Sequence, residues 1–181
     1  MIITISGKPG SGKSTVAKII AAKLGLNKYS IGDIRGKMAL DRGITIDELN
    51  EVGEKEDFTD KKADEYQEKL GKDEDNFVID GRLSYYFIPH SIKIFLDVDD
   101  YVGAQRIFSI KREDEEQEDS IEELKNRLSK RVESDHKRYQ KYYSIDFEDK
   151  VNFDIIIDTT DISTEKTADK ILSFIEQKGY K

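Results

Sequence analysis

The chain has 181 residues, of which 38% are charged and 36% hydrophobic, with a formal net charge of -8 and no cysteine. This length suits a single domain, residues 1–181, with a substantial core, while the negative charge argues against a nucleic acid partner, because that backbone attracts basic surfaces. The lack of cysteine excludes disulfides, thiolate metal sites and cysteine nucleophiles.

Short apolar runs rich in β-branched residues predict strands, at residues 2–5, 77–79, 92–96 and 154–157. They lack apolar–polar alternation, which is typical of parallel strands covered on both faces. Helical patterns separate or follow these runs, at residues 14–24, 33–42, 99–112, 120–143 and 163–178. The alternation of strand and helix predicts an α/β fold. Two highly charged segments, residues 43–75 and 113–119, are expected to leave the sheet.

No apolar stretch approaches the roughly 20 residues that a membrane helix requires. No basic region precedes the first apolar residues, as it would in a signal peptide. We therefore expect a cytoplasmic protein without a membrane segment. Since no surplus apolar face is evident, we also expect a monomer.

The stretch GKPGSGKS, residues 7–14, follows the first predicted strand and opens a helix. It matches the pattern G-x-x-x-x-G-K-[ST], in which glycines let backbone N–H groups wrap phosphates. Lys13 is expected to reach the β and γ phosphates, and Ser14 to hold Mg²⁺ beside the positive end of the helix dipole. The pattern predicts a nucleoside triphosphate site formed by Gly7, Lys8, Pro9, Gly10, Ser11, Gly12, Lys13, Ser14 and Thr15.

Asp80 ends another predicted strand, where Walker-B-type carboxylates orient Mg²⁺ or its water ligands. A turn-initiating Asp before a glycine explains this residue equally well. A switch GTPase is disfavoured, because the single Asn-Lys pair, residues 27–28, is followed by Tyr29-Ser30 and not by the guanine-reading x-Asp.

The arginines indicate a phosphorylated acceptor. Only eight of the 30 basic residues are arginine, the side chain that binds phosphate in a bidentate manner. Six of them lie where phosphates could be gathered: Arg35, Arg82, Arg106, Arg112, Arg131 and Arg138. On a helix over residues 120–143, at about 100° per residue, Arg131, Asp135 and Arg138 lie beside or within the apolar stripe. They are therefore expected to face protein or ligand, although a solvated charged face is the alternative.

The succession of GKPGSGKS, YSIGDIR, IDGR and the spaced Arg131, Asp135 and Arg138 resembles the nucleoside monophosphate kinases over essentially the whole chain, and within them the cytidylate kinases. The resemblance implies a P-loop three-layer sandwich with a five-stranded parallel sheet, a helical monophosphate-binding insertion at residues 31–75 and a helical lid at residues 106–135. The stretch IIIDTTDIS is similar to the family's adenine-side loop. The implied reaction is Mg-ATP-dependent phosphoryl transfer to a nucleoside monophosphate, with CMP or dCMP preferred.

The resemblance also implies roles for individual residues. The acceptor is expected to bind to Ser30, Asp33, Arg35, Asp80, Gly81, Arg82, Arg131, Asp135 and Arg138. The expected catalytic residues are Lys13, Arg82, Arg106, Arg112 and Arg131. Ser14 and Asp80 are expected to hold the metal. Arg106 and Arg112 would close over the transferring phosphoryl group, although Arg112 could instead pair with the acidic run that follows it.

Two positions depart from the family pattern. Leu83 stands where bacterial cytidylate kinases place the Asp that reads the cytosine amine, which is more similar to the archaeal-type members. In those members an arginine falls at what is here Gly36, one residue after Arg35. A triplet on the insertion offers alternative base readers, although such triplets are usually a solvated face: Asp60, Asp64 and Gln67.

A monophosphate acceptor, with a second pKa near 6, is largely dianionic at neutral pH and requires no general base. Catalysis then consists of positioning and charge neutralisation, and His90 and His136 are expected to be structural. The alternatives are transfer to UMP, AMP or another small acceptor; a non-nucleotide alcohol would need a carboxylate base, for which Asp33 is the candidate. A regulatory nucleotide-binding module with slow hydrolysis is a further alternative, and it would not need Arg131 and Arg138 on the inward side.

Overall fold

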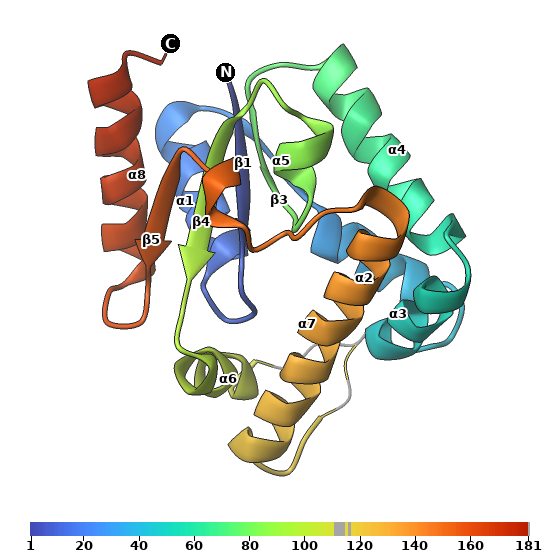
Figure 1. The fold of residues 1–181 in the computed structure, drawn as a ribbon. Coiled ribbons are helices and arrows are strands. Elements are labelled where there is room, and N and C mark those ends of the chain that lie inside the picture. The colour runs from blue at the N-terminus through green and yellow to red at the C-terminus, as the bar shows by residue number, and fades with distance from the viewer. Residues whose placement is uncertain (111–114, 116, 181) are drawn as a thin grey trace.

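The computed structural model describes residues 1–110, 115 and 117–180, and five of its strands form one parallel sheet. The order across the sheet is β2-β3-β1-β4-β5 (Figure 1). The strands are β1 (Ile2–Gly7), β2 (Asn27–Ser30), β3 (Phe77–Asp80), β4 (Ile92–Asp97) and β5 (Ile155–Asp158). All neighbours pair in parallel, so their carboxyl ends meet at one edge of the sheet.

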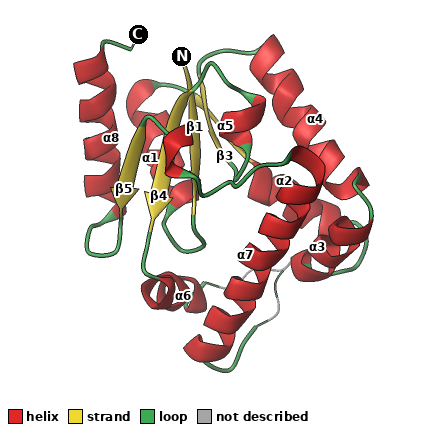
Figure 2. Cartoon of the chain, viewed as in Figure 1, coloured by secondary structure: helices red, strands yellow, loops and turns green. Residues whose placement is uncertain are grey.

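The helices connect the strands and cover the sheet (Figure 2). They are α1 (Lys13–Leu24), α2 (Ile31–Leu40), α3 (Ile46–Lys55), α4 (Phe58–Asp73), α5 (Ser84–Phe87), α6 (Asp100–Phe108), α7 (Ile121–Tyr143) and α8 (Thr164–Lys178), with a 3-10 turn, η1 (Lys150–Asn152). The strand arrows in Figure 1 point toward the end of the molecule where α6 and α7 lie. No helix of the described chain has the length and apolarity to cross a membrane.

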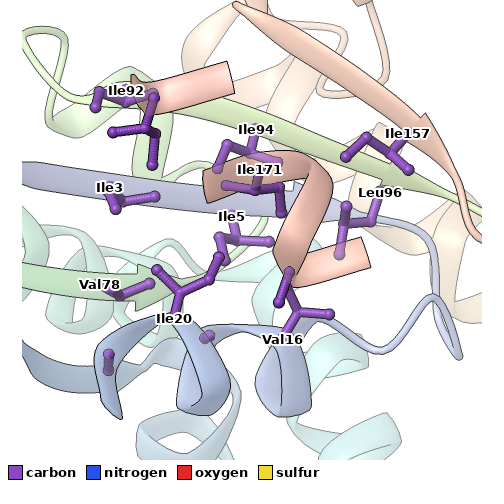
Figure 3. Close-up of a cluster of buried hydrophobic side chains, with 14 residues drawn as sticks. Ile3, Ile5, Val16, Ile20, Val78, Ile92, Ile94, Leu96, Ile157 and Ile171 are labelled. Atoms are coloured by element: carbon purple, nitrogen blue, oxygen red, sulfur yellow. The ribbon is translucent and has the colours of Figure 1, made fainter. Parts of the chain in front are cut away.

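The core forms on both faces of the central strand, because alternate side chains of a strand point to opposite faces. Ile3 and Ile5 pack with residues of α1 and α8 on one face (Figure 3), whereas Ile2 packs with residues of α4 and β3 on the other. β1 is buried along its whole length, as the apolar run predicts for a strand covered on both sides. These layers confirm the predicted α/β three-layer sandwich with a five-stranded parallel sheet.

The element boundaries differ from the sequence expectations in a few places. β2 was not among the predicted apolar runs, because the sequence NKYS of this edge strand is only partly buried and carries no apolar periodicity. The helix expected over residues 99–112 ends at Phe108. The charged segment 43–75 forms α3 and α4, and α3 begins at a capping box in which Thr45 and Glu48 each bond the other's backbone N–H.

Candidate active site

The predicted phosphate loop lies between β1 and α1. Gly7 and Gly10 have φ angles of 142° and 74°, and a Cβ on either would lie within 2.2 Å of a backbone oxygen, of Leu96 and Gly103 respectively. These positions therefore require glycine. The backbone N–H groups in the first turn of α1 have no intrahelical carbonyl to bond, which makes this helix start a site for phosphate oxygens.

The two lysines of the loop differ in placement. The Lys13 ammonium donates to the carbonyls of Gly7 and Lys8, at 2.9 and 2.6 Å, so it lies over the loop. The Lys8 ammonium lies 3.4 Å from a carboxylate oxygen of Asp97 and 3.2 Å from one of Asp100. Lys8 therefore contributes its backbone to the loop, while Lys13 is the cation placed for a bound phosphate.

Asp80, at the end of β3, forms the centre of a small polar cluster. Its Oδ2 accepts from the Ser14 hydroxyl at 2.8 Å and from the Ser30 hydroxyl at 3.1 Å. Its Oδ1 is buried and accepts no hydrogen bond within the described part of the chain, although the Lys28 ammonium lies 3.5 Å away. Hydroxyl and carboxylate oxygens are the ligands that Mg²⁺ prefers, and Mg²⁺ at phosphate sites uses one or two protein ligands with substrate and water completing its shell. The residues present therefore fit the metal.

A cavity of about 380 Å³ extends from the phosphate loop to the insertion. Most of the predicted site residues line it: Pro9, Gly10, Gly12, Lys13, Ser14, Thr15, Arg35, Asp80, Gly81, Arg82, Arg106, Arg131 and Asp135. Gly7, Lys8, Ser11, Ser30, Asp33 and Arg138 are not on its wall. The wall also includes residues that the sequence analysis did not single out: Ile31, Gly32, Ile46, Asn50, Ile107, Ile110, Glu115, Tyr139 and Thr164.

Arg82 joins the phosphate loop to α7. Its Nη1 donates to the Gly7 carbonyl at 3.1 Å, its Nε pairs with Asp135, and its guanidinium lies 5.2 Å from the centre of the Phe147 ring. Burial would raise the pKa of Asp135, but Arg82 and Arg138 hold that pKa below its usual range. The carboxylate is therefore charged at neutral pH and fixes both guanidinium groups.

Arg35, on the cavity wall, meets Arg138, which lies behind it. The Arg35 guanidinium donates to Asp60 Oδ1 at 2.7 Å and to Asn50 Oδ1 at 2.9 Å. Arg138, only 1% exposed, donates to the same Asp60 oxygen, to Asn50 Oδ1 at 3.4 Å and to Asp135. A buried guanidinium is tolerated only when its charge is paired, and the carboxylates of Asp60 and Asp135 meet that need here.

Arg106, on α6, and Arg131, on α7, line another part of the cavity. Arg131 donates to both carboxylate oxygens of Asp47, at 2.8 and 3.1 Å, and to Glu115 at 2.9 Å. Arg106 donates to the carbonyls of Thr159 and Thr160, at 2.7 and 3.0 Å, and to that of Gly10 at 3.3 Å. Arg106 thus connects the phosphate loop to the segment after β5. The predicted lid residue Arg112 lies outside the described residues.

The remaining candidates lie away from the cavity. The carboxylate of Asp33 is largely exposed and lies 3.6 Å from the Lys28 ammonium. His136 bonds Glu148 at 3.0 Å and packs on the Phe147 ring, and neither it nor the exposed His90 is on the cavity wall. Among the described residues no group of three or more His, Asp and Glu side chains could hold a metal.

The parallel sheet, the glycine loop with Lys13 lying over it, and the Ser14–Asp80 hydrogen bond define a P-loop kinase. A model of the cytidylate kinase-like family matches residues 2–161. A protein named cytidylate kinase from Archaeoglobus fulgidus is 36% identical over 100% of this chain and 98% of its own, and one from Methanosphaera stadtmanae is 34% identical over 98% and 99%. This chain belongs to the cytidylate kinase-like family and is a phosphotransferase of the nucleoside monophosphate kinase class.

Solved structures support the fold. A protein from Eubacterium ventriosum superimposes with a TM-score of 0.69 at 22% identity, covering 97% of this chain and 98% of that one. Shikimate kinase from Aquifex aeolicus gives a TM-score of 0.60 at 22% identity, covering 99% of each chain. At this identity the likeness concerns the architecture alone.

Proposed function

We propose that this enzyme transfers the terminal phosphoryl group of Mg-ATP to CMP or dCMP, giving CDP or dCDP. The observation that carries the proposal is one continuous cavity, lined both by the phosphate loop and by the arginines Arg35, Arg82, Arg106 and Arg131. Donor and acceptor phosphates would meet within it. The full-length relatives named cytidylate kinase supply the choice of a cytidine nucleotide.

In this mechanism a phosphate oxygen of the acceptor attacks the γ phosphorus, and ADP leaves with the electron pair of the broken P–O bond. The acceptor is largely dianionic at pH 7, so no proton has to be removed. The task of the protein is to bring two anions together and neutralise the charge that shifts during transfer. Lys13, Arg82, Arg106 and Arg131 are placed on the cavity wall for this task.

Ser14 and Asp80 would hold Mg²⁺, which neutralises phosphate charge when bound. Arg35, Asp135 and Arg138 form the wall and support of the acceptor end. The proposal includes a monomeric cytoplasmic enzyme that binds nucleotides and not nucleic acid, in keeping with the net charge of -8. A carboxylate base for an alcohol acceptor is not favoured, because Asp33 is exposed and off the cavity wall.

The test is a coupled ADP-release assay with Mg-ATP, offering CMP, dCMP, UMP, AMP, GMP and water in parallel. We expect kcat/KM for CMP or dCMP to exceed the others by about tenfold or more, the discrimination that one or two specific contacts provide. Lys13→Met should lower kcat by about 10²–10³-fold, as loss of one preorganised charge donor does. Equal, slow ADP release in every tube would show that the acceptor is wrong and would favour a slowly hydrolysing regulatory module.

A further inference from the structure

The base of the acceptor must be read by residues other than those that the sequence singled out. Leu83 is only 3% exposed, packs with Tyr85, Tyr139 and Phe147, and is not on the cavity wall. Asp60, Asp64 and Gln67 are also off the wall. Asp60 pairs with Arg35 and Arg138. Asp64 accepts from the Tyr143 hydroxyl, and Gln67 accepts from Ser84 at 2.6 Å.

The acceptor end of the cavity carries one amide. Ile31 and Ile46 line this end together with Tyr139, so it offers apolar surface for the faces of a planar ring. Asn50 lies on the same wall and is 5% exposed. It is the sole Asn or Gln among the described residues of the wall, and therefore the side chain there that offers an amide donor and an amide acceptor to a base edge.

The orientation of this amide is fixed by its arginine neighbours. Arg35 Nη2 and Arg138 Nη2 donate to Asn50 Oδ1 at 2.9 and 3.4 Å. A guanidinium only donates, so the amide atom that it contacts must be the oxygen. Asn50 Nδ2 has no hydrogen-bond partner among the described residues and is not one of the fully enclosed atoms. Asn50 borders this cavity and a second one beside Glu51 and Lys130, and its Nδ2 is the amide donor available to a base at the acceptor end.

We propose that Asn50 is the base-reading residue and that its Nδ2 donates to N3 of cytosine. In cytosine N3 is an acceptor, whereas in uracil N3 carries a hydrogen and would meet the Asn50 N–H donor head-on. A site that forms a hydrogen bond with its substrate disfavours a similar molecule that cannot form it, because a buried polar group of the protein is then left without a hydrogen-bond partner. This inference rests on the proposed function, since it assumes a cytidine nucleotide as acceptor.

Asn50→Asp provides the sharpest test. The substitution keeps the Oδ1 that Arg35 and Arg138 contact and replaces the Nδ2 donor by an acceptor oxygen. CMP and UMP carry the same charge and sugar, so the added negative charge affects both alike and cancels in their ratio. We expect the CMP-to-UMP ratio of kcat/KM, and of the binding constants measured calorimetrically, to fall by about 10-fold to 100-fold.

Two further variants complete the experiment. Asn50→Ala, which removes both groups, should bring the ratio toward one even if Asn50→Asp does not fold. Asn126→Asp adds the same charge at an exposed position of α7 and should leave the ratio unchanged.

The two failures can be told apart. Wild-type enzyme that does not prefer CMP to UMP would overturn the proposed function and this inference with it. Wild-type enzyme that prefers CMP, with equal losses for both nucleotides in the Asn50 variants, would leave the proposed function standing. Asn50 would then only position Arg35 and Arg138.

Discussion

The Asp47 carboxylate, in the first turn of α3, forms a bidentate ion pair with the Arg131 guanidinium on α7. The distances are 2.8 Å from Nε to Oδ1 and 3.1 Å from Nη2 to Oδ2, and Arg127 Nη1 contacts the same carboxylate at 2.7 Å. The pair joins α3 to α7. A phosphate that binds Arg131 has to share this guanidinium with a carboxylate already in place.

We expect Asp47→Asn to lower the free energy of unfolding by about 1–2 kcal/mol at pH 7, because two charged hydrogen-bond partners lose their counter-charge. Burial would raise the pKa of Asp47, but Arg131 and Arg127 hold it below its usual range. A carboxylate with a lowered folded pKa contributes stability that is present above its unfolded pKa and lost as the pH falls through the folded pKa. Urea denaturation at pH 7 and pH 3 should therefore show a smaller gap between wild type and variant at pH 3.

The matched control is Glu133→Gln, which removes an exposed i,i+4 pair with Lys137 on α7. Such exposed pairs contribute little to stability, because solvent screens them. If Asp47→Asn and Glu133→Gln lowered the free energy of unfolding by the same amount, the bidentate pair would hold α3 to α7 no more strongly than an exposed ion pair would.

Asp80→Asn is expected to raise the Mg²⁺ concentration for half-maximal activity by about 10-fold to 100-fold, the range typical of lost carboxylate support at metal sites. Asp80 Oδ1 is buried and has no hydrogen bond within the described chain. The substitution removes the negative charge of this carboxylate, so Mg²⁺ should bind more weakly. The measurement is ADP release during Mg²⁺ titration at fixed ATP. Asp169→Asn, which removes an exposed ion pair with Lys23, serves as the control, and superimposable titrations for all three proteins would exclude Asp80 from the metal site.

Features that depend on neighbours in the chain could be predicted from the sequence. The β-branched runs predicted four of the strands, and the glycine spacing located the phosphate loop. The first helix was predicted to end at residue 24, and it does so at Leu24, before Gly25 with a φ of 67°. β2 could not be predicted in this way. It is extended because Asn27 to Ser30 pair with Phe77 to Asp80. The paired residues are 50 positions apart in the sequence, so local periodicity cannot reveal this pairing.

The partners of the arginines were also beyond prediction. The residue types indicate which side chains can bind phosphate, but the chain separation between Arg131 and Asp47 is 84 residues and that between Arg138 and Asp60 is 78. Which carboxylate neutralises which guanidinium depends on helix packing. Asn50 could not be predicted for the same reason. Its amide is oriented by hydrogen bonds from Arg35 and Arg138, and these form only in the folded chain.

Gly53→Ala should destabilise the fold by about 1–3 kcal/mol, the usual cost of an overpacked position. A Cβ at Gly53 would lie 2.8 Å from Thr59 Oγ1 and 3.0 Å from both Arg138 Cδ and Asp60 Oδ2. The contrast is Gly32→Ala, where the nearest atom, Ser30 Oγ, would be 3.7 Å away. There the better helix propensity of alanine should stabilise by up to about 1 kcal/mol. The midpoint temperature of thermal unfolding should therefore fall for Gly53→Ala and rise for Gly32→Ala. Equal shifts of the two midpoints would contradict the close approach of α3 to α4 and α7.

The Asp64 carboxyl, on α4, has a pKa that burial raises to about 7. The Tyr143 hydroxyl and the guanidinium groups of Arg35 and Arg138 oppose this increase in the pKa, whereas the Asp60 charge adds to it. In the unfolded chain the carboxyl titrates near about 3.9. Between these two values the folded state holds a proton that the unfolded state has lost, so this group contributes stability that is complete below about pH 4 and is lost as the pH rises through about 7.

Asp64→Asn keeps the shape and an acceptor for Tyr143 but cannot acquire the charge. We therefore expect the free energy of unfolding of the variant, relative to that of wild type, to be higher at pH 8 than at pH 5 by about 1 kcal/mol or more. Urea denaturation at the two pH values measures this difference. Carbon-13 NMR titration of the Asp64 carboxyl gives an independent check, with an expected midpoint near the pKa of about 7. A midpoint close to that of an exposed Asp, together with an unchanged stability difference, would show that the Asp64 carboxylate is as well solvated in the folded enzyme as in the unfolded chain.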